Sequence, residues 1–268
     1  MTEVNFELHV VEHCNQWCRD CAHFSPFFTA MYGVKEYSAD EYIPWIDKMK
    51  EQGMCFSVIS LLGGETFLHS DLGKFIRTLK NRYGIKIRVV TNGFWLSSPG
   101  YIKKWEDVFS NADILDFSRY SGTVSRIANY DDKIIELRGM FPLCEIVVRD
   151  ISVHSIINFL VRPERVEVCC HSSECTTLTA DGKLYRCPPA AHARISPAVT
   201  KEFLHARDCS AVYDLNAGNH ISIEDWKNRN PFDACNYCNF WRRIERKQES
   251  APEYFKIIAK HRKTGEIR

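Results

Sequence analysis

The strongest constraint on the fold is the alternation of short β-rich runs with helical stretches between residues 5 and 151. Five runs have the apolar composition and the length of strands: residues 5–13, 56–64, 86–93, 113–120 and 144–151. Helical patterns lie between them, at residues 38–53, 70–84, 101–109 and 127–140, and the first begins with Ser38 and Glu41 in capping-box spacing. Strands that alternate with helices build βαβ units, so the sequence predicts an α/β fold with a parallel sheet.

The alternation stops after about residue 165. Residues 178–187 resemble a hairpin that turns at Asp181 and Gly182, and Ser222 and Asp225 have capping-box spacing before a short helix. Residues 240–268 look helical, with an interruption at Pro252. No repeat or low-complexity linker separates the two parts. We therefore expect two compactly joined domains, residues 1–165 and 166–268, the second being a small α+β unit with a C-terminal helix.

The charge balance argues against two classes of partner. The 268 residues include 35 Lys and Arg and 34 Asp and Glu, for a net charge of +1, so no broad basic surface for nucleic acid or an anionic membrane is expected. The N-terminal residues lack the basic flank and apolar core of a secretion signal, and no stretch approaches the roughly 18 uninterrupted apolar residues of a membrane span. We expect a cytoplasmic protein with no nucleic-acid or membrane partner.

Twelve cysteines are many for such a chain, and most of them are grouped. Disulfides would need an oxidising compartment, which nothing in the sequence suggests, so metal ligation is favoured over scattered buried thiols. The groups are Cys14, Cys18 and Cys21; Cys169, Cys170, Cys175 and Cys187; and Cys235 and Cys238; the remaining three, Cys55, Cys144 and Cys209, stand alone.

The first group has three thiols and no fourth ligand at zinc-finger spacing, although His13 and His23 are close enough to keep zinc open as an alternative. The other interpretation is a four-iron cluster held by three thiolates, which leaves one iron free to bind a ligand. This loop would follow the first strand, and in α/β barrels the active site is built from the loops after the C-terminal ends of the strands.

The loop from Cys14 to Cys21, with the pattern C-x3-C-x2-C, resembles the signature of the radical S-adenosylmethionine (SAM) enzymes. The rest of that family's pattern follows in order at the ends of the next predicted strands: Gly63, Gly64 and Glu65 resemble its GGE motif, Thr91, Asn92 and Gly93 its TNG turn, and Ser118 lies where many members contact a ribose or carboxylate. The resemblance implies that the GGE motif holds the methionine amino group of SAM. One position departs from the family, because Asp20 stands where an aromatic residue near the adenine is usual. We expect Phe24 or His23 to take over that contact.

The resemblance implies a partial (β/α)5–6 TIM-like barrel with a 4Fe–4S cluster that binds SAM. With an electron from a flavodoxin- or ferredoxin-type reductant, such a site cleaves SAM to methionine and a 5′-deoxyadenosyl radical, which abstracts hydrogen from a carbon of the substrate. The part of the barrel is to hold that carbon near the radical and to exclude other hydrogen donors.

The C-terminal cysteines resemble those of the Twitch domain, a shortened SPASM domain that holds an auxiliary 4Fe–4S cluster. Cys187 ends a G-x4-C motif that starts at Gly182, and Cys235 and Cys238 form a C-x2-C pair. Of the cysteines upstream of the glycine, Cys169 and Cys170 fit the family spacing, whereas Cys175 would need a different local loop. The expected ligands are Cys170, then Cys175, with Cys187, Cys235 and Cys238. A zinc ribbon or a purely structural cluster is the alternative interpretation.

A compact chain with three plus four cysteines is similar in architecture to 2-deoxy-scyllo-inosamine dehydrogenase, a radical SAM dehydrogenase of aminocyclitol antibiotic biosynthesis. The resemblance implies oxidation of a small-molecule substrate of sugar or cyclitol type, with the auxiliary cluster as the electron acceptor. The reaction needs a base or an orienting group near the reacting carbon. Arg149 and Tyr120, near the ends of the fifth and fourth strands, are our candidates, with His154 and His192 as further ones, although arginine suits orientation better than proton transfer.

Three alternatives stay open. An epimerase would quench the carbon radical with a thiol hydrogen, for which Cys55, Cys144 or Cys209 is available. A peptide-modifying enzyme of SPASM or Twitch type often carries a leader-binding domain, for which a barrel that begins by residue 5 leaves no room at the N-terminus. A non-catalytic iron–sulfur or zinc scaffold would have no use for the SAM-binding carboxylate of Glu65.

Overall fold

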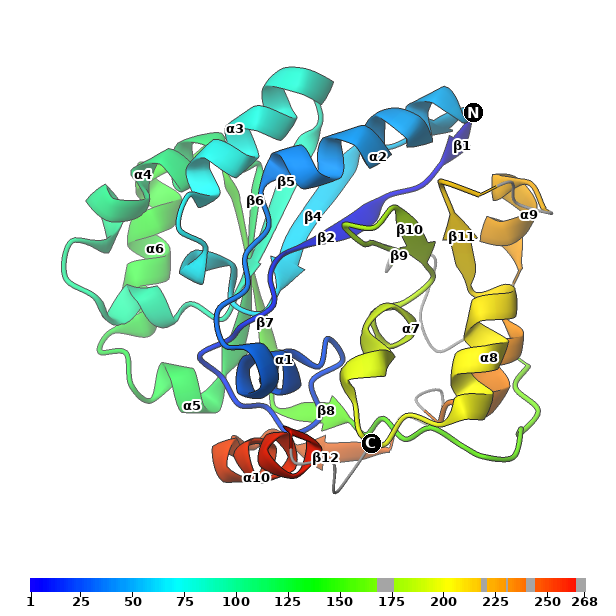
Figure 1. Cartoon of the computed structure of the whole chain (residues 1–268). Coiled ribbons are helices and arrows are strands. Elements are labelled where there is room, and N and C mark those ends of the chain that lie inside the picture. The colour runs from blue at the N-terminus through cyan, green and yellow to red at the C-terminus, as the bar shows by residue number, and fades with distance from the viewer. Residues whose placement is uncertain (168–175, 218–220, 230, 240–243, 264–268) are drawn as a thin grey trace.

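One eight-stranded sheet organises the molecule, in the order β11-β10-β9-β2-β4-β5-β6-β7 (Figure 1). The computed structural model describes residues 1–167, 176–217, 221–229, 231–239 and 244–263. The strands of this sheet are β2 (Phe6–Val11), β4 (Val58–Gly63), β5 (Lys86–Thr91), β6 (Ile114–Tyr120), β7 (Glu145–Ile151), β9 (Thr176–Leu178), β10 (Lys183–Tyr185) and β11 (Val212–Asp214). The five strands expected before residue 151 pair in parallel with one another, which confirms the predicted α/β fold. The arrangement is consistent with a partial barrel.

Helices cover one face of these parallel strands (Figure 1). The four predicted ones are α2 (Ala39–Glu51), α3 (Leu72–Tyr83), α4 (Tyr101–Asn111) and α6 (Tyr130–Met140). At the start of α2 the Glu41 carboxylate accepts the backbone N–H of Ser38 at 2.7 Å, as the capping-box spacing predicts. Shorter elements follow the strand ends: α1 (Ser25–Tyr32), α5 (Ser121–Val124) and the 3-10 helices η1 (Thr66–Leu68) and η2 (Phe94–Ser97). A small parallel pair joins β1 (Thr2–Glu3) to β3 (Met54–Cys55).

The two faces of the sheet differ in chemistry. Ile59, Leu61, Val89 and Phe117 are completely buried in the face that packs against the helices, where apolar burial stabilises the fold. Successive residues of a strand point to opposite faces. The other side, which we call the polar face, therefore carries Glu7, His9, Arg88, Asp116, Ser118 and Arg149.

The strands after residue 165 extend the same sheet beyond β2. β9 runs parallel to β2, whereas β10 is antiparallel to both β9 and β11. The predicted turn at Asp181 and Gly182 joins β9 to β10, and Gly182 adopts a φ of +81° that glycine tolerates best. The sheet is therefore continuous across the predicted boundary between residues 165 and 166. Around it lie α7 (Pro188–His192), η4 (Ala193–Ile195), α8 (Lys201–Ser210), α9 (Ile223–Asn228) and η5 (Asp233–Tyr237).

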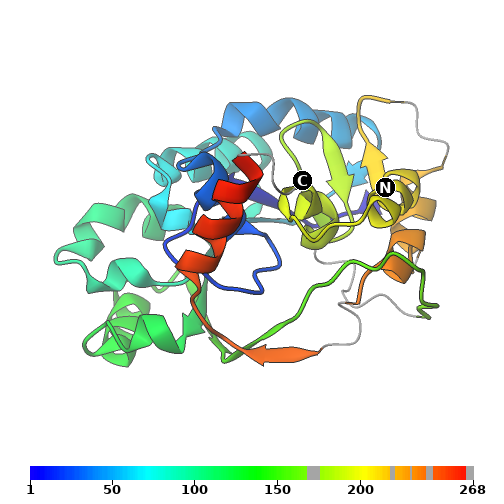
Figure 2. The same ribbon diagram turned by 60° about the horizontal axis from the view of Figure 1, so that its bottom comes forward.

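The C-terminal tail differs from its prediction. Of residues 240–251, expected to be helical, Glu245–Lys247 form strand β12, which pairs antiparallel with β8 (Val153–Ser155). Helix α10 (Pro252–Lys263) begins at Pro252 rather than being broken by it, because proline has no N–H to lose in a first helical turn. Figure 2 shows α10 beside α1, where the rings of Phe255 and Phe27 meet at 4.7 Å. Within the described ranges, no helix is both long and apolar enough to cross a membrane.

Candidate functional site

The three motifs predicted from the sequence meet at the C-terminal edge of the parallel strands. One pocket is lined by the loop after β2, the ends of β4 and β5, and the polar face of β6. Of the predicted residues, it is bordered by Cys14, Cys18, Cys21, Gly63, Gly64, Glu65, Thr91, Asn92, Ser118 and Tyr120. This is the edge at which α/β barrels build their active sites.

Two glycines let the end of β4 approach the cysteine loop. The N–H of Gly64 donates to the Val11 carbonyl at 2.8 Å, and the N–H of Glu65 donates to the His13 carbonyl at 3.1 Å. A Cβ on Gly64 would collide with the backbone of His13, and one on Gly63 with the carbonyl of Val11. Only residues without a side chain allow this contact, which fixes the start of the loop next to Glu65.

Glu65 joins the GGE and TNG motifs into one hydrogen-bonded unit. Its carboxylate is 1% exposed and accepts from the Thr91 hydroxyl at 2.6 Å and from the backbone N–H groups of Asn92 and Phe67 at 2.7 and 3.1 Å. Burial raises the pKa of Glu65 to about 7, although these hydrogen bonds oppose the rise. The Asn92 side chain in turn donates to Asn15 in the cysteine loop at 2.7 Å.

The three thiols fit a cluster better than a single zinc ion. Burial raises the pKa of Cys14, Cys18 and Cys21, that of Cys18 to about 12, and the neighbouring Cys21 thiol adds to the rise at Cys14 and Cys18. Such thiols ionise when a metal takes the place of the proton. Their sulfurs do not all lie within 4.8 Å of one another, whereas sulfurs on one tetrahedral zinc would lie about 3.8 Å apart.

The C-terminal segment, residues 246–251, runs along the cysteine loop. The backbone carbonyl of Trp17 accepts a hydrogen bond from the Ala251 N–H at 2.8 Å, and the Gln248 side-chain amide donates to the Cys18 sulfur at 3.6 Å. Asp20, the residue that departs from the family pattern, pairs with Arg246 of this segment at 3.1 Å. The departure at Asp20 therefore has a structural partner that the local sequence could not reveal.

Phe24 does not line the pocket, contrary to its expected contact with the adenine. Its left-handed backbone, with φ of 55°, turns the side chain into the core, where it is 6% exposed and its ring lies 6.2 Å from that of Phe159. His23, the other residue considered for this contact, does line the pocket. We correct the assignment of Phe24 to core packing.

The two expected catalytic residues lie in different surroundings. Tyr120 lines the pocket with its ring 5.7 Å from that of His154, and burial raises its pKa well above the ordinary value. Arg149 is outside the pocket lining and pairs with the buried carboxylate of Asp116 at 2.7 Å. Arg88 approaches the same carboxylate at 4.0 Å. Sequence reasoning missed Asp116, although its alternation with Ser118 on one strand places both on the polar face.

The second cysteine group is only partly described. Cys170 and Cys175 lie outside the described residues, as does Cys169. Arg186, which precedes Cys187, lies over the ring of Phe232 at 5.4 Å, and Phe232 is the residue before η5, which carries Cys235. Cys187 is therefore in the neighbourhood of the C-x2-C pair. Cys238 and Phe159 form an isolated backbone β-bridge. The ring of Phe159 packs on that of Phe24, which lies three residues after Cys21.

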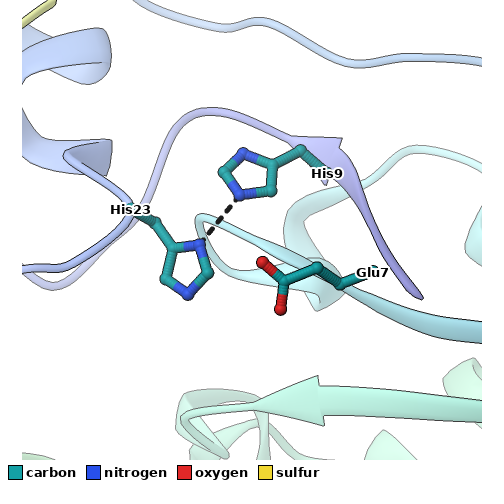
Figure 3. A group of neighbouring side chains, drawn as sticks. All are labelled: Glu7, His9 and His23. Carbon is teal, nitrogen blue, oxygen red and sulfur yellow. Dashed lines mark hydrogen bonds between the residues drawn. The ribbon is translucent and has the colours of Figure 1, made fainter. Parts of the chain in front are cut away.

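A cluster of histidines and glutamates beside β2 was not predicted as a site. Figure 3 shows Glu7, His9 and His23, with His9 Nε2 2.9 Å from His23 Nδ1. Burial raises the pKa of Glu7 to about 8 and lowers that of His9 to about 3. His192, considered above as a base, is buried here instead, with its ring stacked on that of His9 at 3.8 Å. The signal was available in FELHVVEH, where the polar side chains alternate with apolar ones.

Comparison with known proteins finds a family-model match to the N-terminal part of the chain. Residues 8–123 match the family model of the radical SAM superfamily. The crystal structure of BtrN in complex with AdoMet and 2-DOIA is similar in fold, with a TM-score of 0.50 at 14% identity over 89% of this chain and 94% of that one. SuiB of Streptococcus suis bound to S-adenosylmethionine gives a TM-score of 0.37 at 16% identity over 54% and 32%. A search of the curated proteins found no match. The matched residues include Cys14, Cys18 and Cys21, the GGE and TNG motifs and Ser118, so most of the pocket lies in the part of the chain that is similar to that superfamily.

Proposed function

We propose that this chain is a radical SAM enzyme that oxidises an alcohol group of a small polar substrate, of sugar or cyclitol type, with an auxiliary 4Fe–4S cluster as the electron acceptor. The observation that carries the proposal is the pocket that three thiols line together with Glu65, Thr91 and Ser118. The fold likeness to BtrN, solved with AdoMet and 2-DOIA, supports the choice of substrate class.

The residues of this pocket fit the two cofactors of the family. Cys14, Cys18 and Cys21 would hold the first cluster, and the ends of β4, β5 and β6 would hold SAM. When bound and reduced by a flavodoxin- or ferredoxin-type donor, these cofactors supply a 5′-deoxyadenosyl radical for hydrogen abstraction. Three hydrogen bonds already fix the Glu65 carboxylate, so it would offer the methionine amino group a rigid hydrogen-bond acceptor.

The polar face would orient the substrate. Asp116 is 4% exposed and faces two arginines, and the Arg149 side chain remains 55% exposed beyond its ion pair. We therefore assign Arg149 a positioning role, since the ion pair keeps the guanidinium charged and fixed. Tyr120 and His154 line the pocket itself, and in this proposal they would contact substrate hydroxyl groups.

The C-terminal cysteines would hold the electron acceptor. Phe24 and Phe159 pack between the first cysteine loop and the C-x2-C pair, so the two cysteine sets are joined by contiguous side chains rather than separated by solvent. The proposed ligands are Cys187, Cys235 and Cys238 with one upstream cysteine, Cys170 in preference to Cys175.

Epimerisation has less support. A thiol that quenches the substrate radical has to reach the SAM pocket, but Cys55, Cys144 and Cys209 do not line it. Cys55 is at the end of β3, Cys144 is buried before the start of β7, and Cys209 is exposed on α8.

The test is iron content and product analysis on cysteine variants. Anaerobic reconstitution should give about eight irons per chain, as two four-iron clusters. Replacing Cys14, Cys18 and Cys21 with alanine should remove roughly half of the iron and abolish SAM cleavage, and SAM cleavage that survives would refute the first site. Cys55→Ser is the control and should keep both properties.

Replacing Cys235 and Cys238 with alanine should lower the iron content, spare SAM cleavage and prevent completed oxidation of the substrate. Unchanged iron would show that these cysteines are not ligands. Full product formation with half of the iron lost would show that the second cluster is not the electron acceptor. Deuterium transfer into 5′-deoxyadenosine from labelled sugars and cyclitols identifies the substrate.

A further inference from the structure

The side chains of Glu7, His9 and His23 lie close together (Figure 3). Their ligand atoms all lie within 4.8 Å of one another. Glu7 and His9 come from the polar face of β2, and His23 comes from the cysteine loop and lines the SAM pocket. Glu7 is 6% exposed and His9 is 2% exposed. Two imidazoles and one carboxylate are the donor set of zinc sites of the His2Glu type and of non-haem iron(II) sites.

The hydrogen bonds around His9 aim one of its ring nitrogens at His23. Nδ1 lies 2.9 Å from a carboxylate oxygen of Glu12, whose other oxygen accepts from the Tyr37 hydroxyl at 3.2 Å. A proton on Nδ1 satisfies this contact, and Nε2 then carries the lone pair that faces Nδ1 of His23 at 2.9 Å. A histidine whose second nitrogen donates to a carboxylate is the usual arrangement of a metal-bound imidazole.

Glu7 is a buried carboxylate without a basic partner. In the described part of the chain no lysine, arginine or histidine side chain forms an ion pair with it. Its Oε1 accepts from the Thr177 hydroxyl at 2.6 Å, which fixes the carboxylate in the way that metal-bound carboxylates are fixed by hydrogen bonds. A buried carboxylate that stays ionised is paired with a charge or bound to a metal.

A second group, formed by His9, Glu12 and His192, fits an ion less well. The rings of His9 and His192 are stacked 3.8 Å apart with an angle of 14° between their planes. Imidazole lone pairs lie in the ring plane, so two stacked rings cannot both direct them at one ion. The rings of His9 and His23 are inclined by 48°, and their nitrogens face each other. His192 Nε2 has no hydrogen-bond partner among the described residues, so this ring contacts His9 by stacking alone.

We propose that Glu7, His9 and His23 bind one divalent transition-metal ion, of the zinc or iron(II) type, at a site separate from both cysteine sets. Magnesium and calcium fit less well, because they prefer all-oxygen ligands. Three protein ligands leave a coordination position for an oxygen ligand. If the proposed function holds, that ligand is a hydroxyl of the substrate, because His23 borders the pocket that would hold SAM.

The experiment uses the full chain after anaerobic cluster reconstitution, with zinc as the probe. One equivalent of Zn2+ is added, weakly bound metal is removed, and the zinc content and the zinc K-edge absorption are measured. One zinc per chain with only nitrogen and oxygen neighbours, at about 2.0–2.1 Å, supports the site. No retained zinc, or zinc with sulfur neighbours at about 2.3 Å, overturns it.

Three variants locate the ion. Glu7→Gln and His23→Gln should each lower the zinc affinity at least tenfold, and Glu12→Gln should lower it about 10–100-fold by loosening His9. His205→Gln, an exposed histidine on α8, is the matched control and should not change it. Unchanged zinc affinity in Glu7→Gln and His23→Gln that load iron normally overturns the assignment. If a variant fails to fold, the wild-type spectrum alone decides.

SAM cleavage measured on the same samples separates this inference from the proposed function. A wild-type protein that cleaves SAM but holds no zinc with nitrogen and oxygen neighbours would refute the metal site alone. A protein that holds such zinc but never cleaves SAM would refute the proposed function alone.

Discussion

Replacing Gly64 with alanine should separate the end of β4 from the cysteine loop. The added Cβ would overlap the backbone of His13, the residue before Cys14, whereas real Cβ atoms keep at least about 3.0 Å from other heavy atoms. The backbone is not the far end of a flexible side chain, so the two segments have to move apart by about 1 Å.

The loss of folding stability follows from the hydrogen bonds that this movement breaks. The hydrogen bonds from Gly64 to Val11 and from Glu65 to His13 both join the segments that separate. Each contributes about 1 kcal/mol net, and overpacking adds about 1–3 kcal/mol. We expect a loss of about 3–5 kcal/mol in the free energy of unfolding, which lowers the midpoint by roughly 10 °C for a chain of this size.

The assay is thermal unfolding of the cluster-free protein by circular dichroism, followed by iron analysis after reconstitution. Gly139→Ala is the matched control, since a Cβ at this helical position of α6 meets no atom within 4 Å and alanine should stabilise the helix by up to about 1 kcal/mol. The two substitutions should therefore have opposite signs. A Gly64→Ala protein as stable as the control, with a normal iron content, would show that the loop does not depend on this close approach.

Three further perturbations test separate parts of the structure. The pKa of Glu65 is about 7 when folded, above its ordinary 4.5, so the folded state keeps the carboxyl proton to a higher pH than the unfolded chain does. Between pH 4.5 and 7 the wild type should therefore lose about 3 kcal/mol of folding stability that Glu65→Gln keeps. Denaturant titrations of both cluster-free proteins at the two pH values measure this difference. Asp116→Asn should leave Arg149 without its partner, lowering substrate turnover more than SAM cleavage; equal losses would contradict a positioning role. Phe255→Ala should cost about 3–5 kcal/mol in chemical denaturation, because that ring is 1% exposed against Phe27; a loss below 1 kcal/mol would contradict the docking of α10.

The sequence predicted most of the fold because its strands and helices are locally encoded. Parallel strands end at a common edge, so motifs spaced along the chain had to meet, and Glu65 does contact Thr91 and Asn92. The prediction failed where distant contacts decide the conformation. Glu245–Lys247 form a strand because β8 offers an edge nearly a hundred residues earlier, which outweighs a local helical preference.

Side-chain direction was the other limit. Phe24 was expected in the pocket because it follows Cys21 so closely, but its left-handed backbone turns it away. Arg149 could be placed on a strand end, whereas its ion pair depends on the register between β6 and β7, which sets Asp116 two pairs away from the pair of Ser118 and Arg149. Register is set by packing and turns across the assembled sheet, and the residues of one strand do not reveal it.

The contact between Gln248 and Cys18 spans 230 residues of the chain. At about 5–20 residues per second, a ribosome needs roughly 10–50 s to synthesise what lies between them. For all of that time the nascent chain carries three thiols that still lack their covering segment. The yield of iron-loaded protein should therefore depend on how well the translating cell keeps those thiols reduced.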